Sequence, residues 1–146
     1  MTSIWKQNTN LAKLNNHRSA GLGDMLDIKI VGRGVNWLLA EMPIAAKHKQ
    51  PFGIVHGGAT AALAETVASV AGWLCVDVKT QAAVGLELNI NHLRAVTRGV
   101  LTAKATAIHI GRLTQVWQID IYNLEFKQVS TARLTITVTA KLRDRN

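Results

Sequence analysis

The sequence is poor in cysteine and proline. Its 146 residues include one cysteine, Cys75, and two prolines. A single cysteine excludes an intramolecular disulfide framework and any zinc site built from several cysteines, and it fits a reducing, cytoplasmic environment. With 48% hydrophobic residues and 11 glycines, the composition also excludes a disordered or low-complexity scaffold. Residues 1–16 contain no continuous apolar core, so we expect no secretory signal there.

Acidic residues are scarce as well. Nine Asp and Glu stand against 17 Lys and Arg, which gives a formal net charge of +8 and a pI of about 10.2. Such an excess favours an anionic partner, whether nucleic acid, lipid head groups or a phosphorylated small molecule, and charge alone does not choose among them. The length is that of one domain, so we predict a single domain over residues 1–146 with a basic C-terminal tail at 141–146.

The apolar pattern predicts one long helix among several strands. Residues 59–76 are mostly Ala, Leu, Val, Thr and Ser, which favours a helix of about 18 residues. A shorter helix is expected at 9–16, capped by Asn8 or Thr9. Alternating or β-branched apolar runs predict strands at 26–31, 35–42, 83–95, 100–110, 113–122 and 132–142. We therefore predict an α+β fold in which a curled antiparallel β-sheet wraps around one long central helix.

The alternation within two of these strands predicts which side chains face the core. In the strand at 83–95 the apolar face would carry Val84, Leu86, Leu88 and Ile90. In the strand at 132–142 it would carry Ala132, Leu134, Ile136, Val138, Ala140 and Leu142. Both patterns are typical of half-buried antiparallel strands.

Glu65 is the only formally charged residue between Pro51 and Val76, and it falls within the long helix. A lone carboxylate on a helix ordinarily marks a solvated stripe. Its neighbours three, four and seven positions away are small instead: Gly58, Ala61, Ala62, Ala68, Ser69 and Gly72. Small residues permit close backbone contact, so we expect Glu65 to face another chain or a cavity, with Ser69 within hydrogen-bonding reach.

The run His56-Gly57-Gly58 stands at the entry to the same helix. Backbone N–H groups at a helix N-terminus can hold an anion or a developing oxyanion, although a plain helix-entry turn explains the run equally well. If residues 57–65 are helical, Gly57 and Glu65 are about 12 Å apart along the axis, too far to act on one carbonyl group. A two-fold dimer with antiparallel helices would bring Gly57 of one chain towards Glu65 of the other.

Several segments resemble one enzyme family. Residues 50–58 (QPFGIVHGG), followed by 63–65 (LAE) and 69–72 (SVAG), resemble the hotdog-fold acyl-CoA thioesterases. Residues 84–94 (VGLELNINHLR) and 115–119 (QVWQI) are similar to the branch that hydrolyses 1,4-dihydroxy-2-naphthoyl-CoA in menaquinone synthesis. The resemblance implies a hotdog fold, an active site at the interface of a dimer or of a dimer of dimers, and thioester hydrolysis without a cofactor, coenzyme A being part of the substrate.

The resemblance also implies roles for individual residues. Glu65 would attack the thioester or activate water, and Ser69 would position the water or the carboxylate. The Gly57 N–H would hold the thioester oxygen, assisted by Gln50 and His56. The residues that would contact coenzyme A, with arginine binding its phosphates, are His92, Arg94, Gly111 and Arg112.

Other functions stay open at this point. The nearest is a proofreading thioesterase that clears misloaded aryl groups from a carrier protein in siderophore synthesis, and a second is a non-catalytic hotdog domain that binds acyl-CoA or nucleic acid. Glu65 together with Gln50 and His56 favours the enzyme, and we expect no nucleic-acid partner. The histidines lack metal-site spacing and a glutamate interrupts the long apolar helix, so we expect neither a metal nor a membrane span. Trp73 and Val129-Ser130 depart from the family pattern and leave the acyl group undetermined.

Overall fold

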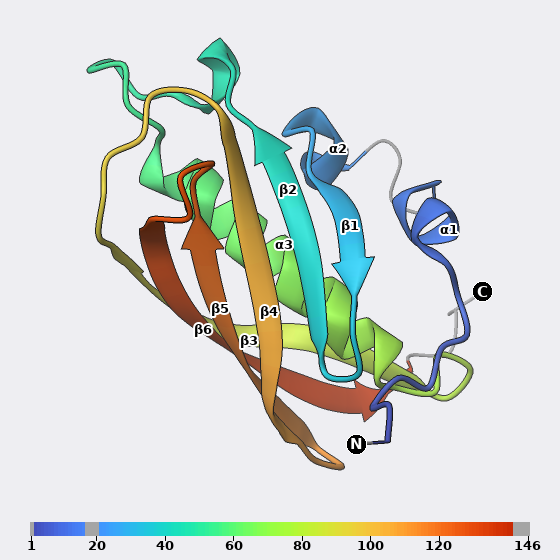
Figure 1. The fold of residues 1–146 in the computed structure, drawn as a ribbon. Coiled ribbons are helices and arrows are strands. Elements are labelled where there is room, and N and C mark those ends of the chain that lie inside the picture. Colours follow the sequence, from blue (N-terminus) through green and yellow to red (C-terminus); the bar gives the residue numbers. More distant parts are fainter. Residues whose placement is uncertain (1, 17–20, 142–146) are drawn as a thin grey trace, which may run out of the picture.

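The computed structural model describes residues 2–16 and 21–141, so most of the predicted basic tail lies outside the described residues. Within this part of the chain, six strands form one antiparallel sheet in the order β1-β2-β4-β5-β6-β3 (Figure 1). The strands are β1 (Lys29–Arg33), β2 (Trp37–Pro43), β3 (Gln81–His92), β4 (Val100–Ile110), β5 (Thr114–Tyr122) and β6 (Gln128–Ala140). The helices are α1 (Leu11–Asn16), α2 (Leu22–Met25) and α3 (Gly57–Leu74), with a 3₁₀ turn at Ala46–His48.

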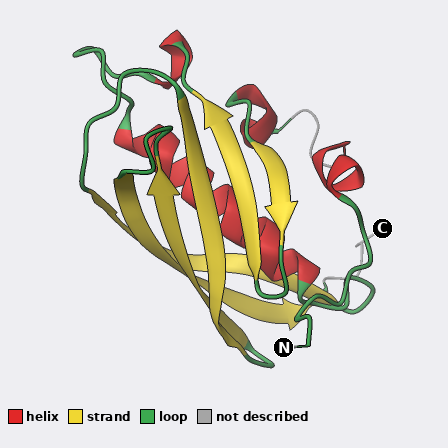
Figure 2. Ribbon diagram, viewed as in Figure 1, coloured by secondary structure: helices red, strands yellow, loops and turns green. Residues whose placement is uncertain are grey.

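The long helix α3 crosses one face of the sheet, which curls around it (Figure 2). The α+β arrangement that we predicted is thereby confirmed. The helix begins and ends two residues before the predicted range 59–76, because His56 caps it by accepting a hydrogen bond from the Gly58 N–H, and the Cys75 N–H turns back to the Gly72 carbonyl. The α3 side chains that lie fully buried against the sheet are Leu63, Ala64, Val67, Ala68, Ala71 and Leu74.

The strands β4 and β5 follow the prediction closely, whereas β6 begins at Gln128, four residues before the predicted range 132–142, and the predicted inward residue Leu142 lies outside the described residues. The bounds of β4 are those predicted, and β5 begins one residue later. On β6 the predicted inward residues Ala132 through Val138 are buried in alternation, while Ala140 is exposed at the strand end. Trp117 of β5 is fully buried and stacks on Trp5 with ring centroids 6.0 Å apart, which ties the N-terminal segment to the sheet.

The N-terminal third differs from the prediction in several places: helix α2 was not predicted, β2 runs over 37–43 instead of 35–42, and α1 and β1 start later. Helix α1 begins at Leu11 because Asn10, rather than Asn8 or Thr9, caps it through a 2.9 Å bond from the Lys13 N–H to Asn10 Oδ1. Residues 26–28 do not belong to the first strand. They follow the short helix α2 in a turn with Asp27 at a φ of 56°, so β1 starts only at Lys29.

The strand β3 breaks the predicted alternation. Leu88 packs against the core as expected, but Val84 and Leu86 are 51% and 68% exposed. The pairing register with β6 shifts between Gly85 and Glu87, which marks a β-bulge with Leu86 as the extra residue. One extra residue exchanges the two faces of a strand, so Gly85 now lies on the same face as Leu88.

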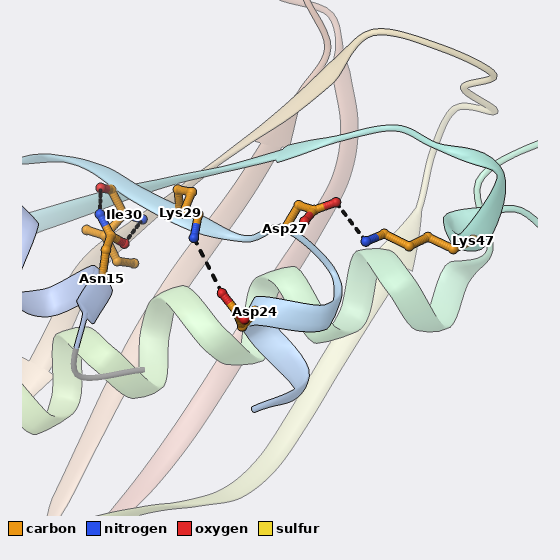
Figure 3. A network of polar contacts seen from close by, with 6 residues as sticks. All are labelled: Asn15, Asp24, Asp27, Lys29, Ile30 and Lys47. Carbon is orange, nitrogen blue, oxygen red and sulfur yellow. Dashed lines mark hydrogen bonds and ion pairs between the residues drawn. The ribbon is translucent and has the colours of Figure 1, made fainter. Parts of the chain in front are cut away.

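The strands β1 and β3 form the two edges of the sheet, and they differ in whether their outer backbone groups are hydrogen-bonded. Asn15 covers β1, since its side-chain amide donates to the Ile30 carbonyl at 3.0 Å and accepts from the Ile30 N–H at 2.8 Å (Figure 3). Within the described residues, no strand pairs with the outer edge of β3. The described part of the chain therefore covers the edge at β1 and leaves the edge at β3 unpaired.

Candidate active site

Glu65 lies near the middle of α3 and is half-buried. Ser69, one helical turn later, donates its hydroxyl to Glu65 Oε1 at 3.1 Å, as we predicted. The carboxylate rests on β3 at Gly85, where an added Cβ would overlap Oε1. Gly72, one of the small neighbours, packs against Ile136 of β6. Part of the close contact that we expected with another chain or a cavity is thus made with the chain's own sheet.

The N-terminus of α3 offers one free backbone donor. The Gly58 N–H is used, because it donates to His56 Nδ1 at 2.8 Å. Within the described chain, no hydrogen-bond acceptor is recorded for the Gly57 N–H. The ring of His92 packs against Gly57. A Cβ atom added at Gly57 would lie 2.8 Å from His92 Nε2, so this contact requires a glycine. A helix N-terminus with an unused N–H is suited to hold a developing oxyanion.

Gln50 belongs to the loop between β2 and α3. The loop closes on itself, because the Gln50 N–H donates to the Ile54 carbonyl at 3.0 Å and the Phe52 N–H donates to Gln50 Oε1. With Oε1 occupied, the two hydrogens on Gln50 Nε2 are left for another acceptor. Gln50 lines the cavity described below.

The segment before Gln50 is anchored by a buried histidine. His48 is 1% exposed, its Nδ1 accepts a backbone N–H of its own turn at 2.9 Å, and its Nε2 donates to the Leu26 carbonyl at 2.9 Å. Lys47 adds an ion pair of 2.7 Å with Asp27, and its hydrogen bond holds the pKa of that carboxyl below the ordinary value (Figure 3). The α2–β1 turn thereby fixes the start of the loop that carries Gln50.

A cavity of about 340 Å³ opens beside the N-terminus of α3. It joins Gln50, Gly57, His92 and Arg94, which the sequence analysis had placed partly in the catalytic group and partly in the coenzyme A group. Ser130 Oγ lies 3.3 Å from His92 Nδ1 and fixes the ring beside Gly57. The other lining residues are Ile54, Val55, Thr60, Leu93, Ala95, Val96, Val129 and Ser130.

The remaining two predicted coenzyme A residues lie elsewhere. Gly111 and Arg112 form the β4–β5 turn and line a separate cavity of about 300 Å³ together with Lys6 and Gln81. Gln81 and His92 are the two ends of β3, which spans about 36 Å at the usual rise per residue. One chain therefore does not bring Arg112 to the cavity that holds Arg94.

Two residues of the site were missed by sequence reasoning. Gly85 supports the Glu65 carboxylate and Ser130 supports the His92 ring. A glycine inside a strand pattern often marks a bulge or a close approach, and that signal was available for Gly85. Ser130 was not identifiable, because its role depends on its pairing with His92 across the sheet.

Residues 2–16 and 21–141 contain neither a metal-binding cluster nor a membrane-spanning helix. No group of three His, Cys, Asp or Glu side chains lies close enough to hold a metal ion. No helix in these segments has the length and apolar character needed to cross a membrane.

Comparison with known proteins identifies the family. A family model described as "Thioesterase superfamily" matches residues 52–130, more than half of the chain. The chain belongs to the thioesterase superfamily. The crystal structure of thioesterase HI1161 from Haemophilus influenzae superposes on this thioesterase with a TM-score of 0.92 and 43% identity, covering 98% of this chain and 99% of the other. The hotdog fold and the activity of a thioester hydrolase follow.

Two curated relatives carry more specific descriptions. The 1,4-dihydroxy-2-naphthoyl-CoA hydrolase of Escherichia coli is 39% identical to this thioesterase over 135 residues, covering 92% of this chain and 98% of the relative. The proofreading thioesterase EntH of Klebsiella pneumoniae is 40% identical over 134 residues, covering 92% and 97% respectively. Since the two relatives are about equally similar, identity alone does not choose between their substrates.

Proposed function

We propose that this thioesterase hydrolyses an aromatic acyl-CoA, with 1,4-dihydroxy-2-naphthoyl-CoA as the substrate, in the cytoplasm. The observation that carries the proposal is the half-buried Glu65 carboxylate, held by Ser69 at 3.1 Å on the helix whose first N–H, at Gly57, is unused. A carboxylate and an oxyanion donor are the two groups that thioester hydrolysis requires. The similarity to the E. coli naphthoyl-CoA hydrolase supports the acyl group.

The proposed site needs two copies of the chain. Gly57 and Glu65 lie on one helix about 12 Å apart along its axis, so the two groups of one chain do not reach the same carbonyl. The free edge of β3 supplies a surface for the second copy, with Val84 and Leu86 exposed on a strand of 12 residues. Two such edges paired antiparallel would form a continuous sheet and a closed two-fold dimer.

The same two-fold dimer resolves the separation of the coenzyme A residues. Antiparallel pairing sets the His92 end of β3 in one copy beside the Gln81 end in the other. Arg112 lines the cavity at the Gln81 end, so Arg112 of the second copy would approach the cavity that contains Arg94. Two arginines from different chains would then bind the phosphates of one coenzyme A.

The proposed reaction proceeds as follows. The thioester oxygen lies on the Gly57 N–H, with donors from Gln50 and His56 alongside, which polarises the carbonyl carbon. Glu65 of the second copy attacks that carbon or takes a proton from the water that attacks it, and Ser69 keeps the carboxylate in place. The C–S bond breaks and coenzyme A leaves as its thiol after protonation. Where water attacks, the acyl group leaves directly as the free acid; where Glu65 attacks, a water molecule then hydrolyses the acyl anhydride on Glu65, which releases the acid and restores the carboxylate.

A second substrate class deserves a direct comparison because the EntH relative is equally similar. In that case the thioester would be carried on an aryl carrier protein instead of coenzyme A. Both substrates present the same phosphopantetheine thioester to Glu65, so they differ only outside the reacting group. A higher kcat/KM for the carrier-bound aryl group than for the naphthoyl-CoA would assign the chain to proofreading.

The test is thiol release from naphthoyl-CoA, benzoyl-CoA and a fatty acyl-CoA by the wild type and by Glu65→Gln. We expect Glu65→Gln to lower kcat by about 10²–10⁴-fold, as for loss of a general base or nucleophile. Glu87→Gln is the matched control, since Glu87 is an exposed carboxylate on the outer face of β3. Equal thiol release by Glu65→Gln and wild type would overturn the catalytic assignment, and preference for the fatty acyl chain would overturn the substrate.

A further inference from the structure

Gly85 is the residue of β3 on which the Glu65 carboxylate rests. An added Cβ at Gly85 would overlap Glu65 Oε1 and lie 3.4 Å from its Cδ. The next nearest atom, Leu134 Cδ1, is 3.7 Å away, an ordinary contact distance. The carboxylate is therefore the group that excludes a side chain at position 85.

The β-bulge is the reason why a glycine reaches this position. Gly85 pairs with Ile136, whose side chain is buried on the α3 side of the sheet, and Leu88 pairs with Leu134 on the same side. Without the bulge, Leu86 and Leu88 would point to the same face of the sheet, towards helix α3. The Leu86 side chain would then fill the space that the Glu65 carboxylate occupies. The bulge turns Leu86 outward and brings Gly85 under Glu65.

We propose that Gly85, placed by the bulge, is a positioning residue for the catalytic carboxylate: it leaves the space in which the Glu65 carboxylate rests on β3 while Ser69 donates a hydrogen bond to it. This inference rests on the proposed function, because it assigns Gly85 its role through Glu65. The atom that would meet a new side chain is the far end of a flexible glutamate. A methyl group at position 85 therefore displaces the carboxylate without disturbing the backbone.

The test is Gly85→Ala with Gly32→Ala as a matched control. Gly32 is also a strand glycine beside a bulge, and its added Cβ would lie 3.1 Å from the end of a leucine side chain, Leu39. We expect Gly85→Ala to keep the wild-type unfolding midpoint and oligomeric state and to lower kcat by about 10- to 100-fold with KM within about twofold. Gly32→Ala should keep the wild-type kcat.

A double variant separates positioning from a general structural effect. Glu65→Asp withdraws the carboxylate by one methylene, so Gly85→Ala should cause no further loss of kcat in the Glu65→Asp background. Full kcat in Gly85→Ala, independent losses in the double variant, or a lowered unfolding midpoint would each overturn the inference. If Glu65→Gln is inactive while Gly85→Ala is fully active, only this inference fails; if Glu65→Gln is itself active, the proposed function fails.

Discussion

Single hydrogen bonds decide which groups at the N-terminus of α3 are donors. His56 Nδ1 accepts from the Gly58 N–H, so the neutral ring carries its proton on Nε2. Gln50 Oε1 accepts from the Phe52 N–H, which leaves the amide hydrogens of Gln50. Together with the unused Gly57 N–H, all three groups present hydrogen-bond donors. Gly57 and Gln50 line the cavity and suit a carbonyl oxygen that gains negative charge, whereas His56 is exposed and does not line this cavity.

Cys75, at the C-terminal end of α3, makes the stability of the protein depend on pH at alkaline values. Burial raises the pKa of its thiol from 9.0 to about 12, with the charge of Lys6 opposing the rise. The unfolded chain therefore loses this proton first, and the thiol's contribution to stability falls as the pH rises from about 9 towards 12. Urea unfolding at pH 8 and pH 10 measures the change. Cys75→Ala should show a smaller loss between the two pH values, and an equal loss in both proteins would contradict the assignment.

At the scale of elements, the proposed dimer depends on the unpaired edge of β3. A lysine at Leu86 would put a charge at the exposed bulge beside the free edge, so Leu86→Lys should hinder pairing with a second copy. We expect sedimentation to shift from dimer to monomer and kcat/KM to fall by about tenfold or more, because a monomer lacks half of the site. Val31→Lys is the control, since Val31 is 41% exposed on β1, whose edge Asn15 covers. A Leu86→Lys protein that remains dimeric and active would refute this role of β3.

The strands and the helix differ in how well the sequence pattern alone predicts them. The strand β5 follows from period-two alternation, since its burial pattern alternates without interruption, and the helix α3 follows from its composition. The bulge in β3 is invisible to a pattern of period two, because its position depends on the register with β6. The same holds for the site: Glu65 and Gly57 are identifiable from residue type and spacing, whereas the contacts of Gly85 depend on three-dimensional pairing.

At the scale of the whole molecule, part of the positive charge gathers beside the cavity. The hydrogen bond and charge of Lys127, together with the more distant charges of Arg94 and Arg98, hold the pKa of Glu125 below its ordinary value. Arg94 lines the cavity itself, and Glu125 lies in the β5–β6 turn at the same end of the sheet. Part of the net charge of +8 thus lies beside this cavity, which suits the anionic phosphates of the proposed substrate.

The central claim is that one active site takes Gly57 and Gln50 from one copy and Glu65 from another, and subunit mixing tests it most directly. Gln50→Ala and Glu65→Gln are each purified, unfolded together in equal amounts and refolded. Half of the dimers then contain one of each chain, and one of their two sites is intact, so the mixture should reach about a quarter of wild-type kcat. A mixture no more active than the mean of the two separate variants would contradict the shared site.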